Sequence, residues 1–122
     1  LATLAPVADG PTLLRLREAV RHVKVEESVR RYVVAISHAT RAHAALEVGA
    51  SPRATLALYQ TSQALAALRG RDFVTPDDVK FLAPAVLTHR VLISPQTRLR
   101  GRTPEAIIDE VVTSVPAPVA TI

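Results

Sequence analysis

The chain has 122 residues, no cysteine and a formal net charge of +4, so it can form one domain with a single core but no disulfide or thiolate metal site. Hydrophobic residues make up 48% of the chain and aromatic residues 3%, which argues against disorder and predicts an aliphatic core of closely packed helices. No apolar run reaches the roughly 20 residues that span a bilayer.

The chain begins with a mainly apolar lead-in, residues 1–11, that lacks the basic residues of a signal peptide. Residue 1 is not Met, so we expect a fragment of a longer protein or a processed product. A short helix is predicted from Thr12, and residues 22–25 alternate like an extended link. The side chains expected to face the core from this helix are Leu13, Leu14, Leu16, Ala19 and Val20.

A long helix is predicted over residues 26–43, because two glutamates stand in its positively polarised first turn and apolar residues recur at helical spacing. Ser37 and Arg41 lie away from the centre of this apolar stripe. The residues expected on the stripe are Val25, Val29, Tyr32, Val33, Ile36, Ala39, Thr40 and His43.

Two further helices are predicted in the middle of the chain. One covers residues 51–69 and ends at Gly70. The other covers residues 76–82 and continues to His89 after a kink at Pro84. Their expected core residues are Ala54, Leu58, Thr61, Leu65 and Leu68 in the first and Val79, Leu82, Val86 and Leu87 in the second.

The last third of the chain is predicted to hold an extended apolar segment, residues 91–93, a mobile basic loop, residues 94–102, and a helix over residues 103–115. The last helix should turn Ile107, Ile108, Val111, Val112 and Val115 inward. The fold class is therefore all-α, a small bundle of about five helices, with at most a minimal strand pair between residues 22–25 and 91–93.

One helix start combines several unusual residues. Ser51 can cap the helix, Pro52 suits its first position, and Gly49 lets the chain turn before it. Arg53 follows in the first turn, where the helix dipole disfavours a cation by about 0.3–1 kcal/mol. Because helix N-termini bind phosphates, this pattern suggests an arginine presented to a phosphate. On the local pattern alone, a solvated arginine is the simpler interpretation.

The sequence contains no self-sufficient catalytic motif: GxxxxGK[ST], GxGxxG, GxSxG and HExxH are all absent. His38 and His43 are five residues apart on the predicted helix and face different sides, so no metal site is predicted. The acidic pairs at residues 77–78 and 109–110 are interpreted as first-turn acids and solvated surface.

Thirteen of the fifteen cationic residues are arginine, which suits phosphate or carboxylate partners but also fits a high-GC genome. Arg98, Arg100 and Arg102 alternate after Arg90 and could neutralise nucleic-acid phosphates. This basic stretch contains no aromatic residue for base stacking, which weakens that interpretation.

Over residues 48–94 the chain resembles the C-terminal lid subdomain of the MoxR family of AAA+ ATPases, through GASPRA, LRGRDFVTPDDVK and LAPAVLTHR. The resemblance extends over about residues 12–115. It implies a lid domain, residues 12–115, preceded by a linker, residues 1–11, from an ATPase core that this chain lacks, and followed by a tail, residues 116–122.

By motif position, the resemblance implies that Arg53 is the sensor 2 arginine, which contacts the γ-phosphate of ATP and couples nucleotide state to the lid angle. It also implies that Gly49, Ala50, Ser51 and Pro52 lie near the nucleotide. The Walker A, Walker B, sensor 1 and arginine-finger elements are absent, so this chain alone is not expected to bind ATP tightly or to hydrolyse it.

The resemblance further implies that the full-length protein is a cytoplasmic, chaperone-like ATPase that uses ATP and Mg²⁺. Its implied partners are its own AAA+ core, the neighbouring subunits of a homo-oligomeric ring, and a von Willebrand factor A domain protein. Two other classes stay open: a stand-alone helical protein-interaction module and, with less support, a DNA-binding domain.

Overall fold

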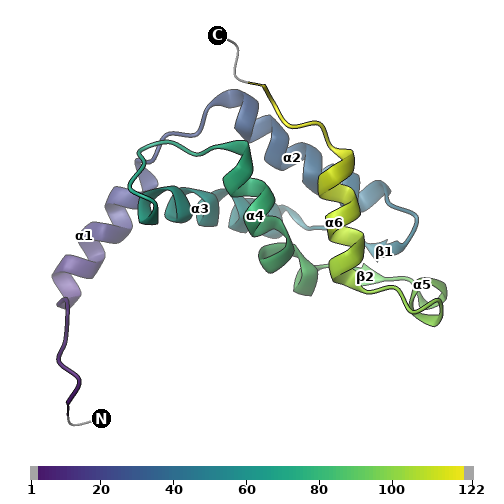
Figure 1. Cartoon of the computed structure of the whole chain (residues 1–122), viewed down its shortest axis with the longest axis horizontal. Coiled ribbons are helices and arrows are strands. Elements are labelled where there is room, and N and C mark those ends of the chain that lie inside the picture. Colours follow the sequence, from purple (N-terminus) through teal and green to yellow (C-terminus); the bar gives the residue numbers. More distant parts are fainter. Residues whose placement is uncertain (1–2, 120–122) are drawn as a thin grey trace.

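The computed structural model describes residues 3–119, which form a bundle of helices with a very small sheet at one end (Figure 1). The all-α prediction is confirmed, and no helix in this range is both long and apolar enough to cross a bilayer. The elements are α1 (Gly10–Arg21), α2 (Glu27–Ala42), β1 (Leu46–Val48), α3 (Pro52–Leu68), α4 (Pro76–Leu87), the 3₁₀ turn η1 (Thr88–Arg90), β2 (Leu92–Ile93), α5 (Pro95–Leu99) and α6 (Pro104–Ser114).

Most helices begin with the same local arrangement. In α1, α3, α4, α5 and α6, a capping side chain accepts a hydrogen bond from the backbone N–H three residues on, and a proline occupies the first turn. Such a cap stabilises a helix by about 1 kcal/mol. The capping residues are Asp9, Ser51, Thr75, Ser94 and Thr103.

The core lies between α2, α3, α4 and α6 and is aliphatic, as predicted. The predicted inward faces of α2 and α6 are largely confirmed, although Ser37 is also fully buried. The predicted face of α3 is rotated, since Ser62, Gln63 and Ala66 are buried whereas Leu68 is 86% exposed. Polar residues can occupy this face because they are hydrogen-bonded. Ser62 donates to the Leu58 carbonyl of its own helix, and Gln63 donates to the carbonyls of Arg21, at the end of α1, and Val23, just after it.

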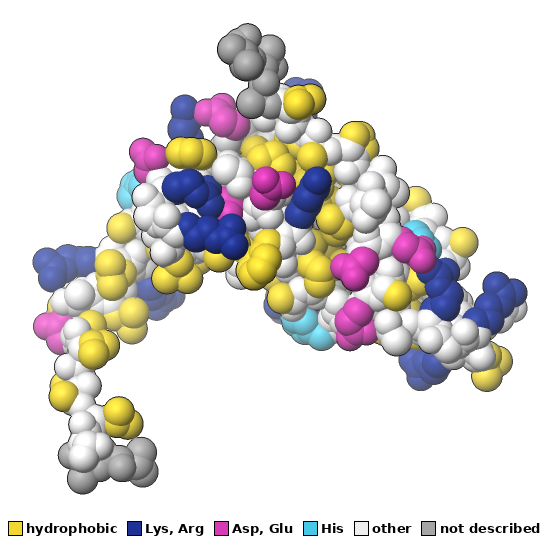
Figure 2. Space-filling model, in the orientation of Figure 1, with side chains coloured by type: hydrophobic (Ala, Val, Ile, Leu, Met, Phe, Trp, Pro, Cys, Tyr) yellow, Lys and Arg dark blue, Asp and Glu magenta, His cyan; other side chains and the backbone are white. Residues whose placement is uncertain are grey.

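The predicted burial of the α1 stripe is wrong. No residue of α1 is buried, and Leu13, Leu14 and Leu16 are 56%, 62% and 55% exposed. Figure 1 shows why: α1 projects away from the bundle and meets α3 only near its own C-terminal end. Figure 2 shows the hydrophobic side chains exposed along this arm. Within residues 3–119 nothing buries Leu13, Leu14 or Leu16, whereas Val20, near α3, is half-buried.

The minimal strand pair exists, but its predicted partner is wrong. β1 pairs with β2 in antiparallel fashion, with Leu46 opposite Ile93. Residues 22–25 instead make a single bridge, in which the Lys24 N–H donates to the Asp72 carbonyl and the Val74 N–H donates to the Lys24 carbonyl. The chain reverses directly after α2, and this reversal brings β1 beside β2.

Two other local predictions also differ from the structure. Pro84 does not interrupt α4, which runs continuously to Leu87 before the 3₁₀ turn. The N–H that proline lacks would have bonded the Lys80 carbonyl, and Lys80 lies at an exposed position of the helix. The expected mobile loop at residues 94–102 contains the capped helix α5, whose Thr97 side chain is buried.

The turn between α3 and α4 is fixed by Asp78, which stands in the first turn of α4 as predicted and is fully buried. Its carboxylate accepts hydrogen bonds from the guanidinium groups of Arg69 and Arg71 at 2.6–3.0 Å, and it completes a capping box with Thr75. Figure 2 shows basic side chains gathered at this end of α3.

The two phenylalanines of the chain lie beside this cluster. The Arg69 guanidinium lies 5.0 Å from the ring centre of Phe81, and that of Arg71 lies 5.6 Å from the ring centre of Phe73. These are cation–π distances. Both rings are largely exposed, at 64% for Phe81 and 45% for Phe73. Each arginine therefore contacts both the buried Asp78 carboxylate and one exposed aromatic ring.

The Asp78 carboxylate should make the free energy of unfolding depend on pH. Burial acts to raise its pKa, but the hydrogen bonds from Arg71 and Thr75 outweigh burial and lower the pKa from 3.8 to about 2. The carboxylate therefore stabilises the fold above about pH 4, and this contribution, about 2.5 kcal/mol, is lost as pH falls toward 2.

Urea unfolding of the chain at pH 6 and pH 3 measures this dependence. In Asp78→Asn the difference between the two pH values should shrink, and stability at pH 6 should fall by about 3 kcal/mol because two arginines lose their partner. Asp77→Asn, at an exposed neighbouring position, is the control. An unchanged pH dependence in Asp78→Asn would contradict this account.

Candidate functional site

The segment before α3 is attached to α2 through both polar backbone groups of Ala50. The Ala50 N–H donates to Thr40 Oγ1 at 2.8 Å, and the Ala50 carbonyl accepts from Arg41 Nε at 2.7 Å. Ala50 and Thr40 are fully buried. Thr40 Oγ1 also donates to the Ser37 carbonyl at 2.6 Å, so its hydroxyl is used as donor and acceptor.

Gly49 is required here by space and not by a special backbone conformation. The positive φ values within residues 3–119 belong to Gly70 and Gly101, so Gly49 does not use the left-handed backbone conformation that favours glycine. A Cβ atom on Gly49 would lie 2.6 Å from both Cα and N of Arg41. Such distances are far below van der Waals contact, so only glycine lets the chain pass this close to α2.

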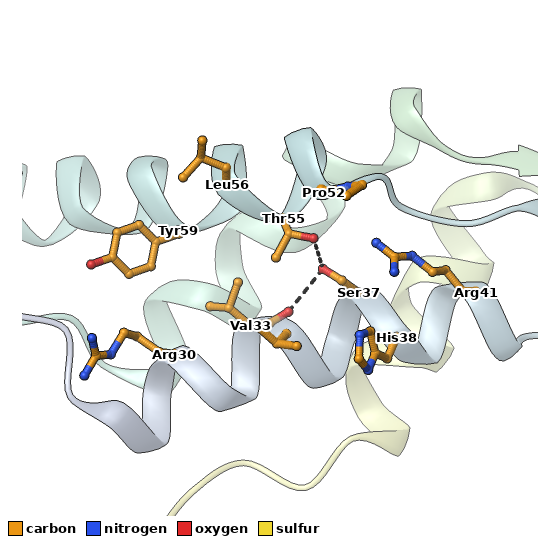
Figure 3. Close-up of a pocket in the computed structure, with 10 residues that line it drawn as sticks. Arg30, Val33, Ser37, His38, Arg41, Pro52, Thr55, Leu56 and Tyr59 are labelled. Carbon is orange, nitrogen blue, oxygen red and sulfur yellow. Dashed lines mark hydrogen bonds between the residues drawn. The ribbon is translucent and has the colours of Figure 1, made fainter.

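A second attachment joins α2 to the first turn of α3. The Thr55 hydroxyl lies within hydrogen-bond distance of Ser37 Oγ, at 2.8 Å, and of the Ser51 carbonyl, at 3.1 Å. Ser37 Oγ in turn donates to the Val33 carbonyl at 3.2 Å. Figure 3 shows this chain of hydroxyls between the two helices.

Arg53 stands between these two attachments. It is exposed, and no hydrogen bond or ion pair within residues 3–119 involves its guanidinium. Ser51 caps the helix by accepting from the Ala54 N–H, Pro52 fills the first position, and the first turn holds no acidic residue. The structure therefore has the positive end of a helix and a cation at one place, where an anion would be stabilised by both.

An open groove of about 510 Å³ runs between α2 and α3 and ends at Pro52, next to Arg53. Its walls are mainly apolar, and cationic side chains stand along its edge, with Arg41 pointing toward the start of α3 in Figure 3. The arrangement suits a ligand with a flat apolar part and an anionic part. The lining residues are Arg30, Val33, Val34, Ser37, His38, Arg41, Pro52, Thr55, Leu56 and Tyr59.

The remaining candidate residues do not form a second centre. His43 Nε2 lies 3.4 Å from a carboxylate oxygen of Glu110, whose other oxygen pairs with Arg102. The hydrogen bond from Arg102 holds the pKa of Glu110 below its usual range. Arg102 is thus paired with a carboxylate, whereas its neighbours Arg98 and Arg100 are exposed on the surface. Among residues 3–119, no group of three or more metal-binding side chains is placed to hold an ion.

The sequence reasoning did not find the residues of α2 that hold the site. Ser37 and Arg41 were placed off the stripe and Thr40 in the core, with no link to Gly49 or Ala50. The available signal is a set of polar residues at helical spacing, Ser37, Thr40 and Arg41, on the helix that precedes the GASPRA motif.

The sequence profile of the AAA lid domain matches residues 38–111, which contain Thr40, Arg41, the segment before α3 and Arg53. Ser37 and the groove residues that precede it on α2 lie outside the matched range. The chain belongs to the AAA lid domain family. The resemblance to the lid of a MoxR-type AAA+ protein is thereby confirmed.

Two relatives of the lid illustrate the match. This chain is 38% identical over 119 residues to the uncharacterized protein YeaC of Bacillus subtilis. It is 36% identical over 115 residues to the chaperone MoxR1 of Mycobacterium tuberculosis. These matches cover 98% and 87% of this chain but 37% and 30% of the relatives. The chain therefore spans about a third of the length of these relatives.

A solved structure gives the same result. The crystal structure of a "putative ATPase" from Cytophaga hutchinsonii matches the lid with a TM-score of 0.84 at 27% identity. The match covers 89% of this chain and 36% of the other. The helical arrangement of the lid is thus shared over most of its length.

The contact between Gly49 and α2 can be tested by substitution. Gly49→Ala should lower the free energy of unfolding by about 1–3 kcal/mol, because the new methyl group forces the segment away from Arg41. Urea unfolding measures the change. Gly10→Ala is the matched control, since nothing lies within 4 Å of a Cβ atom at that position. Equal stabilities of the two variants would contradict the proposed contact.

Proposed function

We propose that this lid closes over ATP held by an ATPase core outside the chain and that Arg53 is its sensor 2 arginine, contacting the γ-phosphate. The observation that carries the proposal is the position of Arg53: it is exposed and free of partners within residues 3–119, in the first turn of α3 at the end of the groove. A guanidinium without a partner at this place would be stabilised by a bound anion.

The chemistry of the site supports this role. A guanidinium can donate two parallel hydrogen bonds to phosphate oxygens, and the N-terminus of α3 adds its own partial positive charge. Fixed positive charge of this kind stabilises the charge that develops on a phosphoryl group during transfer. The apolar groove walls at Pro52 and Leu56 suit the flat face of a nucleotide base next to Gly49, Ala50 and Ser51.

The groups needed for catalysis beyond charge stabilisation are proposed to belong to the core. Within residues 3–119 no carboxylate cluster is placed to hold Mg²⁺, and no side chain of the groove is a nucleophile beside a base. ATP and Mg²⁺ are thus proposed as ligands of the whole protein, with residues 12–115 as the lid, 1–11 as its linker and 116–122 as its tail.

The whole protein is proposed to be a cytoplasmic, chaperone-like ATPase in a homo-oligomeric ring. The relationship to the protein named chaperone MoxR1 supports this proposal. Its proposed partners are its own core, the neighbouring subunits and a von Willebrand factor A domain protein. The exposed leucines of α1 support packing against the core, because they form an apolar surface at the end of the lid where the chain enters from residue 3.

Arg53→Ala in the full-length protein tests the sensor 2 role. The turnover number for ATP should fall about ten- to hundredfold, because a positive charge that stabilises the transferred phosphoryl group is lost. The unfolding midpoint should be unchanged, since Arg53 has no partner within residues 3–119. Arg98→Ala, which removes an exposed arginine of α5, is the control. Unchanged turnover and KM in Arg53→Ala would refute the proposal.

The proposed contact of α1 with the core predicts different effects in two forms of the protein. Leu13→Ser with Leu16→Ser should leave the unfolding midpoint of the 122-residue chain unchanged, because both side chains are more than half exposed. In the full-length protein the same changes should lower the midpoint by a few degrees. Leu68→Ser, at an 86% exposed position of α3, is the control. Equal effects in both forms would contradict the contact.

A further inference from the structure

We propose that Thr40 and Arg41 are positioning residues for Arg53: they fix the backbone before α3 and so set the direction in which the arginine leaves the lid. This inference rests on the sensor 2 role proposed above and extends the site to helix α2. Neither residue belongs to the GASPRA motif, and Thr40 is fully buried, so it reaches the nucleotide only through Ala50.

The first step is the orientation of one peptide segment. Thr40 accepts the Ala50 N–H at 2.8 Å and Arg41 donates to the Ala50 carbonyl at 2.7 Å. With both polar groups of Ala50 bonded to adjacent residues of one helix, the segment cannot rotate without losing a hydrogen bond. Ser51 follows in the extended conformation that its cap requires, with φ −76° and ψ 165°, and α3 begins from that fixed point.

The second step is the attachment on the other side of Arg53. Thr55, two residues further along α3, lies 2.8 Å from Ser37 Oγ on α2. Arg53 therefore lies between contacts at residues 50 and 55 that both lead to the same helix. A shift of its backbone would have to break one of them, so α2 and the arginine move as one unit.

The third step is the choice of side chains. Arg41 is exposed, whereas Ala50, whose carbonyl accepts from it, is fully buried. A guanidinium there restrains the carbonyl in one direction, which water does not. Catalytic groups lose about a hundredfold in effect when they are misplaced by about 1 Å, so a restraint beside Arg53 has a direct consequence for turnover.

The experiment uses the full-length protein and measures kcat, KM for ATP and the unfolding midpoint. Thr40→Val removes the acceptor for the Ala50 N–H and keeps nearly the same volume, whereas Thr40→Ser keeps the hydroxyl. At an assay temperature below the unfolding midpoint, kcat of Thr40→Val should fall about tenfold with a smaller change in KM. The kcat of Thr40→Ser should stay within about twofold of the wild-type value. Arg41→Gln, at an exposed position, provides a second variant that should fold normally and lower kcat similarly.

The decisive comparison combines each substitution with Arg53→Ala. If Thr40 and Arg41 act through Arg53, Thr40→Val and Arg41→Gln should lower kcat by less than about twofold in the Arg53→Ala background. A loss of the same factor in both backgrounds would show a merely structural role and overturn the inference. Thr61→Val is the control, because the Thr61 hydroxyl bonds only carbonyls of its own helix and its loss should leave kcat unchanged.

Two further outcomes separate this inference from the proposed function. If Arg53→Ala lowers kcat but Thr40→Val and Arg41→Gln leave it at the wild-type value, the positioning role is wrong and the sensor 2 role stands. If Arg53→Ala itself leaves kcat unchanged, the sensor 2 role fails and the positioning role fails with it.

Discussion

The site depends on the two hydrogen bonds that α2 makes with Ala50. Together with the contact between Thr55 and Ser37, they join the segment before α3 and the first turn of α3 to one helix. The bonds are possible only because Gly49 lets the backbone pass close to Arg41. The absence of a side chain at Gly49 and the polar side chains of Thr40 and Arg41 therefore hold the same segment, which leads directly to Arg53.

The opposite end of α3 is fixed by a different kind of interaction. There a buried carboxylate, Asp78, holds two arginines and caps the next helix, so one charged group joins α3, the turn and α4. Buried ion pairs are costly when a partner is lost, and this one has several partners. α3 is thus held by polar contacts at both ends, while aliphatic side chains pack along its middle.

Much of the fold could be predicted from the sequence because its helix starts are local. A capping residue followed by proline marks α3, α4 and α6 without any knowledge of the rest of the chain. The same pattern at Ser94 was missed because α5 has only five residues and shows no apolar period. Non-local features were predicted wrongly: periodicity makes α1 amphipathic but does not say what covers it, and the partner of residues 91–93 depends on a chain reversal after α2. Arg53 could be placed in a first turn, whereas the contact of Arg41 with Ala50 joins residues brought together only by the fold.

The two fixed ends of α3 have a mechanical consequence. The helix has 17 residues and is therefore about 25 Å long, with Arg53 at one end and the Arg69–Asp78–Arg71 cluster beyond the other. A rod of that length, tilted by about 5° at one end, displaces the other by about 2 Å. A ligand on Arg53 would therefore act at one end of this rod, and the exposed rings of Phe73 and Phe81 lie beyond its other end.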